Sequence, residues 1–463
     1  MKWCSVSIIF LLVGAIIRVA GYTSSAIRYD EAISLYRATT PFLQYLIDLQ
    51  RYSSLFLWEF ILRFWSILGT ELWLIRLPAV VIGILTLFLV WKLMGILAFS
   101  PQQKAFVSFL IAFCPGLIWI SQDARAYGLL VFLYLLSILF IFKKKWLGFF
   151  AANGLLLYTH ITGPAFVVGS FAFAIAYNHK DWKRIIVLGF AVVISWIPWI
   201  LVYFNVKQTP QFINTFWLGK ISLEGFFREF MLAFFSRQVN ELPIVLFLLA
   251  IALSVILLGI NTISHLDKRI YLFLVPFVVI LVESIFWYNT LFYRTLITLI
   301  IPFTLVLGSL VGSRNWRLLS WVMVGLWILI TGIGIIGWNP RLRGGNVDKA
   351  AQTIRDSWQE GDVIYYGTGT AALPFDYYLS DKPRFILNGV ANSNLTPPTL
   401  HNFDFIALEE IQYKRAWIIF PMDTFIPQVQ MNRLLNYVKG GELIQIINIF
   451  EIPDIRVYLV DTE

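Results

Sequence analysis

Long runs of apolar residues restrict what this chain can fold into. Apolar side chains make up 59% of its 463 residues and charged side chains only 14%, whereas soluble domains carry about 25% charged residues. So few charges cannot cover a surface that faces water, which excludes a soluble enzyme, a coiled coil and a disordered chain. A spanning helix needs about 20 mostly apolar residues. The eleven runs that we interpret as spans are 5–21, 73–97, 105–120, 128–142, 146–158, 163–177, 185–203, 242–260, 270–288, 295–311 and 318–338.

Basic residues concentrate in alternate connections between these runs. With a cytoplasmic N-terminus, the inside segments hold 12 Lys and Arg in 36 residues, and the outside segments hold 10 in 106. The positive-inside rule therefore predicts an N-in, C-out protein. Two outside loops are long, 22–72 and 204–241, and contain amphipathic patterns typical of interfacial helices, although ordinary packing on the bundle explains them equally well. This topology also explains the net charge of +9 without a nucleic-acid partner.

Composition changes after residue 338, where turn-forming residues begin a less apolar region. Alternating helical and strand patterns predict a small extracytoplasmic α/β domain over 339–463, of unknown role. The expected helices are 347–359, 371–379 and 424–438, and the expected strands are 362–366, 416–420, 443–450 and 456–460.

Unusual polar residues of the membrane part gather at the outside ends of the predicted spans. They are Asp30, Glu31, Asp123, Arg125, Tyr127, His160, Tyr293 and Arg294. Charged groups at membrane level are costly unless they face a wet cavity or each other. Alone, each has a structural explanation, such as a helix cap, a local ion pair or an interfacial arginine. Arg18 and Glu283, about one turn deeper, could simply neutralise each other. Together, the carboxylates and arginines predict one site.

Chemistry narrows what such a site would bind. A carboxylate at the mouth of a cavity can act as general base toward a hydroxyl. Arginines at headgroup level can hold a phosphate through charge-assisted hydrogen bonds. A sugar joined through phosphate to a polyprenyl chain would place its anomeric carbon between base and arginines. Alternatively, Asp30 and Asp123 could hold a divalent cation, Mg or Mn, that stabilises the leaving phosphate.

Several short motifs keep their order against the spans. They are Arg28-Tyr29-Asp30-Glu31-Ala32, Ile75-Arg76-Leu77-Pro78-Ala79, Ser121-Gln122-Asp123-Ala124-Arg125-Ala126-Tyr127, and Tyr158-Thr159-His160 with Gly163, and more loosely Tyr293-Arg294 with Pro302. Through them, residues 5–310 resemble the polytopic glycosyltransferases of the GT-C class, specifically the glycosyltransferase family 39 group, which includes protein O-mannosyltransferases.

The resemblance implies a GT-C-like fold and a lipid-phosphate sugar used on the extracytoplasmic face. It also implies that Asp30 is the catalytic base with Glu31 beside it, and that Asp123 and Arg125 shape the donor site. Relatives often carry a His-Pro-Pro-Leu-Tyr-like stretch in the first outside loop, where this chain has Arg51-Tyr52-Ser53-Ser54-Leu55. The identity of the acceptor therefore stays open.

The sequence thus predicts a multi-pass hexosyl- or pentosyltransferase of a bacterial plasma membrane. It would transfer a sugar, with inversion, from polyprenyl phosphate to a hydroxyl of a glycan, lipid or protein. The expected catalytic residues are Asp30, Glu31 and Asp123; the expected phosphate contacts are Arg125, Arg294, Arg76 and Tyr127; His160 and Tyr293 are further candidates. The alternatives are a lipid-linked polysaccharide polymerase or ligase, a decayed non-catalytic scaffold, and a lipid flippase or transporter, which would need a midplane site and internal repeats.

Overall fold

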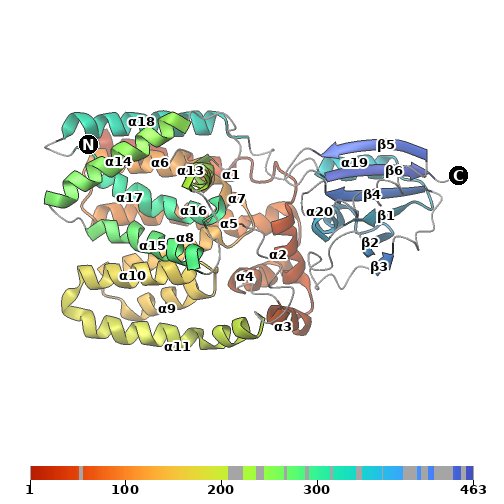
Figure 1. Cartoon of the computed structure of the whole chain (residues 1–463), viewed down its shortest axis with the longest axis horizontal. Helices are drawn as coiled ribbons and strands as arrows, with labels where there is room; N and C mark the ends of the chain where they lie inside the picture. The colour runs from red at the N-terminus through yellow and green to blue at the C-terminus, as the bar shows by residue number, and fades with distance from the viewer. Residues whose placement is uncertain are drawn as a thin grey trace.

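A computed structural model gives the arrangement of the chain. The residues it describes are 2–51, 56–206, 223–235, 244–264, 268–286, 291–312, 316–339, 347–367, 369–388, 404–407, 415–421, 442–449 and 455–461. They form a helical bundle, a cap of short helices at one end of it, and a β-sheet domain beyond that cap (Figure 1).

Where the structure describes them, the eleven apolar runs fall on helices, and 105–120 and 295–311 are each divided between successive helices. The bundle helices are α1 (Lys2–Val19), α5 (Leu72–Ile96), α6 (Pro101–Phe113), α7 (Pro115–Gln122), α8 (Tyr127–Phe142), α9 (Trp146–Leu157), α10 (Gly163–Tyr177), α11 (Trp182–Val206), α14 (Ile244–Ser264), α15 (Tyr271–Phe286), α16 (Tyr293–Leu296), α17 (Ile300–Leu310) and α18 (Arg317–Ile336), with 3-10 turns η2 (His179–Asp181), η3 (Lys268–Ile270) and η4 (Ile297–Leu299). Over the described ranges, four helices are long and apolar enough to cross a membrane, or five with the bent α6–α7 pair. The number of eleven spans therefore remains a prediction. The apolar helices themselves are those of a helical membrane protein.

The outer faces of the bundle are apolar. On α11, for example, Val187, Phe190 and Ile194 are each more than 60% exposed. Soluble proteins rarely expose such contiguous patches, so these faces are the ones a bilayer would cover. The centre of the bundle is closed by large buried side chains, among them Trp327 and Phe234.

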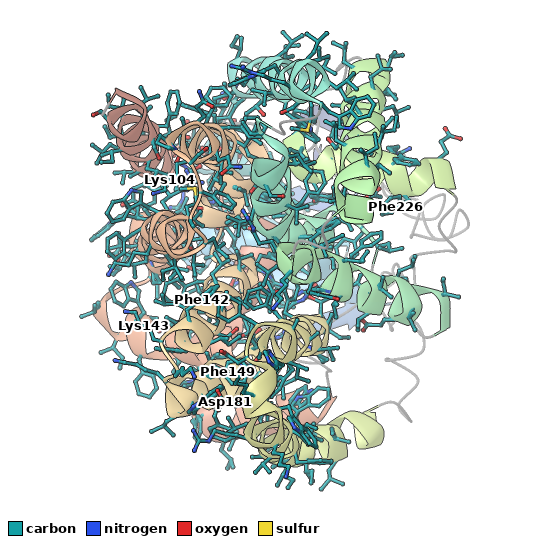
Figure 2. All side chains as sticks on the ribbon, turned by 90° about the vertical axis from the view of Figure 1, so that its left-hand side faces the viewer. Lys104, Phe142, Lys143, Phe149, Asp181 and Phe226 are labelled. Atoms are coloured by element: carbon teal, nitrogen blue, oxygen red, sulfur yellow. The ribbon has the colours of Figure 1, made fainter. Side chains whose placement is uncertain are left out.

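Segments predicted to share one side of the membrane lie at the same end of the bundle. Figure 2 looks onto the end that faces away from the sheet domain, and Lys104, Lys143 and Asp181 lie there. All three belong to segments predicted to be cytoplasmic. The cap and the sheet domain lie at the opposite end, beside the segments predicted to be outside (Figure 1). Which end faces the cytoplasm stays a prediction.

One predicted span is not continuous. Residues 105–120 were expected as a single helix, but α6 ends before Cys114, and α7 begins at Pro115 with its axis turned by 55°. Proline has no amide hydrogen to donate to the carbonyl four residues earlier, so the helix breaks there. The bend directs the C-terminal end of α7 toward the cap.

The long first loop forms the cap: α2 (Tyr29–Thr39), α3 (Phe42–Arg51), α4 (Leu57–Trp65) and η1 (Ser66–Leu68). The described part of the second long loop is α13 (Leu223–Phe235). Phe230, Phe234 and Phe235 of α13 are buried in the bundle core, so this helix packs inside the protein rather than lying at the membrane interface.

The C-terminal region contains α19 (Val347–Asp356), α20 (Gly369–Leu379) and six strands in one sheet. The strands are β1 (Val363–Tyr366), β2 (Arg384–Asn388), β3 (Asp404–Ala407), β4 (Arg415–Pro421), β5 (Glu442–Ile449) and β6 (Ile455–Asp461), in the order β3-β2-β1-β4-β6-β5. The first four strands are parallel, with Ile364 opposite Trp417, and β6 is antiparallel to both β4 and β5. Strands β2 and β3 were not expected, and the expected helix 424–438 lies outside the described residues.

The sheet domain and the cap share one hydrophobic core. Ala32, Ile33 and Leu35 of α2 cluster with residues of α19, α20, β1 and β4, such as Phe375 and Trp417. The boundary at residue 338, drawn from composition, therefore does not separate two independent cores.

Candidate active site

The N-terminus of α2 presents two carboxylates in different directions. Arg28 is the residue before the helix, and Asp30 and Glu31 lie in its first turn, where the helix dipole favours negative charge. The Asp30 side chain is 20% exposed, whereas that of Glu31 is buried. The exposed carboxylate can meet a ligand, and the buried one cannot.

Glu31 forms a buried two-point ion pair with Arg76 of α5. The Nε and Nη2 atoms of Arg76 donate to Oε1 and Oε2 of Glu31 at 2.8 and 2.6 Å. Backbone carbonyls of Tyr22, Ser25 and Ala26 take its three other N–H groups. Burial alone would raise the pKa of Glu31, but Arg76 outweighs it and lowers that pKa to about 2.

This geometry differs from the expected phosphate contact of Arg76 and from the expected catalytic role of Glu31. Arg76 has no N–H left for a phosphate, because a guanidinium offers only five. Glu31 accepts a further hydrogen bond from the backbone N–H of Ala124 at 3.0 Å and is shielded from any substrate. Both residues therefore hold neighbouring segments together instead of contacting the reacting groups.

Asp30 lies among guanidinium groups. Its Oδ2 accepts hydrogen bonds from Arg28 at 3.1 Å and from Arg294, which reaches it from the start of α16. Arg125 donates to the backbone carbonyl of Asp30 at 3.1 Å. Burial favours the neutral acid, but Arg294, Arg125 and Arg28 together hold the pKa of Asp30 well below its ordinary value.

The segment from Asp123 to Arg125, which follows α7, is attached to the cap. Asp123 accepts a hydrogen bond from Arg28 at 3.3 Å, and Arg125 donates to the Ser34 hydroxyl at 2.7 Å. The indole N–H of Trp58 donates to the Ala124 carbonyl at 2.7 Å. Burial, with Glu31 and Asp30 nearby, raises the pKa of Asp123 to about 6 despite the opposing effect of Arg28.

Aromatic rings form one wall of the site. The Trp119 ring on α7 stacks on Tyr293 with centroids 5.5 Å apart, and the Arg28 guanidinium lies 4.7 Å from the Trp119 centroid. Arg294 donates to the Tyr293 hydroxyl at 2.9 Å. Stacking and this hydrogen bond fix the direction of Arg294, whose side chain is 26% exposed.

His160 and Tyr127 lie beside each other, with ring centroids 5.0 Å apart. The Nδ1 atom of His160 lies 2.9 Å from the Thr162 hydroxyl and 3.3 Å from the Thr162 backbone N–H. Burial and then Arg125 lower the pKa of His160 to about 3. His160 is thus a neutral hydrogen-bond donor near the arginines.

The structure brings Asp30, Asp123, Arg125, Arg294 and Tyr293 into one cluster, as the sequence analysis expected. It adds Arg28, which bridges Asp30 and Asp123, and the supporting side chains Ser34, Trp58 and Trp119. The Arg28 role was open to prediction, because it lies two residues before Asp30. Ser34, Trp58 and Trp119 belong to no motif that would mark them as site residues in the sequence.

The donor set suits an anion better than a cation. Arg28, Arg125 and Arg294 bring three positive charges to two carboxylates, Asp30 and Asp123, while Glu31 and Arg76 cancel each other. Over the described ranges, no group of three or more His, Cys, Asp or Glu side chains is close enough to hold a metal ion. Arg28 bonds both carboxylates that were expected as metal ligands, so a guanidinium bridges them in this structure, and a requirement for Mg or Mn stays a prediction.

Comparison with known proteins shows which solved structures share the fold of this chain. No family model and no curated protein sequence matches the chain. Two solved structures of ArnT from Cupriavidus metallidurans are similar to it: one bound to undecaprenyl phosphate, with a TM-score of 0.58, and one in the apo state, with a TM-score of 0.60. In both cases 12% of residues are identical, over 98% of this chain and 97% of the other. Bundle, cap and sheet domain together therefore have the fold of ArnT.

Proposed function

We propose that this protein is a membrane glycosyltransferase of the GT-C class. It transfers a sugar from a polyprenyl-phosphate donor to an acceptor hydroxyl at the extracytoplasmic face. One observation carries the proposal: a partly exposed carboxylate, Asp30, lies between Arg28 and Arg294, two guanidinium groups suited to phosphate. The ArnT fold supports it, because an ArnT structure contains undecaprenyl phosphate.

The donor phosphate binds Arg294 and Arg28, with Arg125 adding positive charge nearby. Guanidinium groups match phosphate oxygens in a planar, two-point geometry, and low-dielectric surroundings strengthen the attraction. Tyr293 keeps Arg294 in place. The side chains of Tyr127 and His160 border the same cluster and offer neutral hydrogen bonds to a sugar.

Asp30 is the general base. In the free protein its guanidinium neighbours hold its pKa low, so it is a weak base. A bound phosphate competes for the same N–H groups, which weakens their hold on Asp30 and raises its basicity. The acceptor oxygen then attacks the anomeric carbon, its proton passes to Asp30, and the bond between that carbon and the phosphate oxygen breaks. Polyprenyl phosphate leaves with the bonding electrons, and the configuration inverts.

Asp30→Asn tests this assignment. Asparagine keeps the shape but accepts no proton, so we expect sugar transfer to fall by about 100-fold or more, the usual contribution of general-base catalysis. Removing the negative charge also frees Arg294 and Arg28, so undecaprenyl phosphate should bind at least as tightly as to the wild type. Transfer at the wild-type rate would remove Asp30 from the base role. Lipid movement across liposomes without sugar transfer would favour the flippase.

A further inference from the structure

A charged side chain lies buried in the bundle without a carboxylate partner. Arg18, near the C-terminal end of α1, is 2% exposed, and none of the ion pairs among the described residues includes it. It therefore does not pair with Glu283, the partner considered above. A buried charge without compensation is expensive, so its environment must supply other partners.

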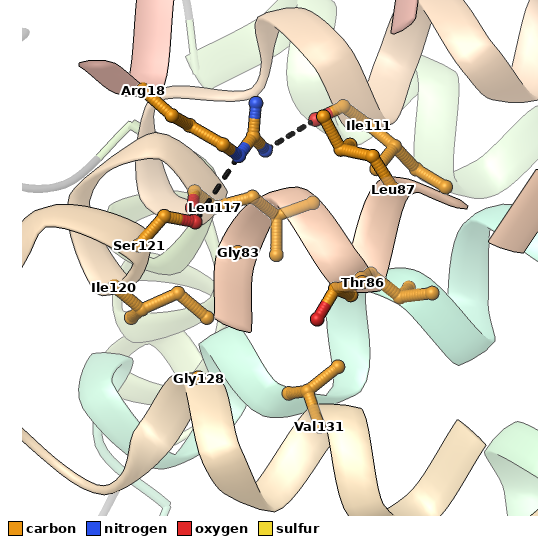
Figure 3. Close-up of a pocket in the computed structure, with 11 residues that line it drawn as sticks. Arg18, Gly83, Thr86, Leu87, Ile111, Leu117, Ile120, Ser121, Gly128 and Val131 are labelled. Carbon is orange, nitrogen blue, oxygen red and sulfur yellow. Dashed lines mark hydrogen bonds between the residues drawn. The ribbon is translucent and has the colours of Figure 1, made fainter. Parts of the chain in front are cut away.

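Those partners come from the break between α6 and α7. Arg18 Nη2 donates to the Ile111 carbonyl at 2.9 Å (Figure 3), and Nη1 donates to the Ala112 carbonyl at 3.2 Å. Ile111 lies four residues before Pro115, so its carbonyl is the one that proline leaves without a helical donor. The guanidinium also lies at the negative end of the α6 dipole.

Arg18 also reaches across the break. Its Nε donates to the Ser121 hydroxyl of α7 at 3.1 Å (Figure 3), and Nη1 donates to the Gly14 carbonyl of its own helix at 2.9 Å. One side chain thus joins α1, the end of α6 and the end of α7. Ser121 precedes Asp123 by two residues and Arg125 by four.

A second side chain makes the reverse connection. Gln122, the last residue of α7, donates through Nε2 to carbonyls of Ile17, Arg18 and Ala20 at 3.0, 3.0 and 3.1 Å. These carbonyls belong to the end of α1, where helices leave acceptors unsatisfied. Arg18 of α1 therefore binds carbonyls of α6 and a side chain of α7, and Gln122 of α7 binds carbonyls at the end of α1. We call Arg18 and Gln122 the clasp.

Two glycines let helices approach closely here, α5 against α7 and α1 against α6. A Cβ at Gly83 of α5 would lie 2.5 Å from the Ser121 Cβ, and one at Gly14 of α1 would lie 2.8 Å from the Ala112 Cβ. Both distances are far inside van der Waals contact. Arg18, Gly83 and Ser121 also line a small cavity with Thr86 and Leu117 (Figure 3). A side chain at Gly83 would therefore push α7 away from α5, and one at Gly14 would push α6 away from α1.

We propose that Arg18 is a positioning residue for the active site: by closing the α6–α7 break, it fixes the segment that carries Asp123 and Arg125. It touches no reacting group and acts only through α7. The ligand assigned to this segment rests on the proposed function. The contacts that Arg18 and Gln122 make do not depend on it.

Two measurements on the full-length protein in detergent test this role. The first is hydrogen–deuterium exchange, which needs no ligand. We expect Arg18→Met to increase exchange in the peptide covering 115–126 and to leave α9 and α10 unchanged. Arg18→Lys, which retains a cation and up to three donors, should give a smaller increase. The matched control is Asn153→Leu, which breaks the buried Asn153–Ser170 hydrogen bond between α9 and α10 and should change exchange only there.

The second measurement is the affinity for undecaprenyl phosphate. We expect Arg18→Met to weaken it by about tenfold, because small displacements of a positioning group have large effects. If Arg18 acts through Arg125, Arg18→Met should weaken the affinity little further when Arg125→Ala is already present. Any effect of Asn153→Leu on the affinity should instead multiply with that of Arg125→Ala.

The outcomes separate the two proposals. Exchange that is unchanged in 115–126, or that rises equally throughout the bundle, overturns the positioning role. Multiplying effects of Arg18→Met and Arg125→Ala also overturn it. Wild-type protein that does not bind undecaprenyl phosphate counts against the proposed function alone, since the exchange experiment still decides the role of Arg18.

Discussion

Glu31 and Arg76 form a two-point ion pair with N–O distances of 2.6 and 2.8 Å, one residue away from the partly exposed Asp30. The pair lies inside the protein and joins α2 to α5. One acid of the Asp-Glu sequence is therefore available for chemistry, and the other keeps the first in place.

Glu31→Gln should destabilise the fold strongly. The change leaves the Arg76 charge buried without its partner, and breaking a buried pair costs about 3–5 kcal/mol. Thermal unfolding in detergent measures the loss. Arg76→Met combined with Glu31→Gln should recover part of it, because no unpaired charge then remains. Equal unfolding temperatures for Glu31→Gln and the wild type would contradict the structural role of the pair.

Arg294→Ala should weaken binding of undecaprenyl phosphate. We expect a loss of about tenfold or more, since a hydrogen bond to a charged group contributes about 1.5–3 kcal/mol. Titration of the lipid onto purified protein gives the dissociation constants. Lys144→Ala is the control, because Lys144 pairs with Asp181, which lies at the end of the bundle that faces away from the sheet domain (Figure 2). Equal losses in both variants would argue against a phosphate contact at Arg294.

The pH dependence of stability should carry a contribution from Asp123. Its pKa is raised to about 6 by burial and nearby carboxylates, above the ordinary value of about 3.9. The folded state therefore binds a proton more tightly than the unfolded state. This contribution is complete below pH 4 and is lost as the pH rises through 6. The carboxyl groups of Asp30 and Glu31, with lowered pKa values, change their contribution only below about pH 4. His160, whose pKa is lowered to about 3, contributes an increase in stability as the pH rises toward its ordinary pKa of about 6.5, which opposes the effect of Asp123.

Melting temperatures between pH 4 and 7 test this assignment. We expect Asp123→Asn to make the slope of stability against pH more positive across that window, because asparagine does not titrate and the increase contributed by His160 is then unopposed by Asp123. An unchanged slope in the variant would assign the titration to another group.

Tyr378→Phe should loosen the contact between sheet domain and cap. The Tyr378 hydroxyl accepts from the Ile27 backbone N–H at 3.1 Å, just before the active-site helix. Losing it leaves that N–H without this acceptor, at a cost of about 1–3 kcal/mol. We expect a lower melting temperature and weaker binding of undecaprenyl phosphate. Tyr377→Phe removes an exposed hydrogen bond to Thr70 and should have little effect on either; matching effects would contradict the specific role of Tyr378.

Much of the helical framework could be predicted, because apolar runs report burial in lipid or core directly. The side on which polar residues gather was also predictable, since the connections alternate between the two ends. The break at Pro115 was missed because residues 105–120 are apolar on both sides of it. The roles of Glu31 and Arg76 were missed for another reason. Sequence shows that charges exist, but only packing shows that Arg76 meets three backbone carbonyls.

Strands β2 and β3 escaped prediction because each is short, with bounds Arg384–Asn388 and Asp404–Ala407. Their order in the sheet depends on pairing with β1, which no local pattern encodes. Arg28 was visible within a motif, yet its bridge between Asp30 and Asp123 required two loops that are 95 residues apart to meet.

The core that α2 shares with the sheet domain has a consequence for how this molecule could change. A truncation or a hybrid made at residue 338 would leave Ala32, Ile33 and Leu35 bare against water and would deprive the sheet of part of its packing. Exchange of the C-terminal portion between related proteins would succeed only if the helix bearing Asp30 travelled with it. The helix that bears Asp30 and the C-terminal sheet are thus packed as one unit.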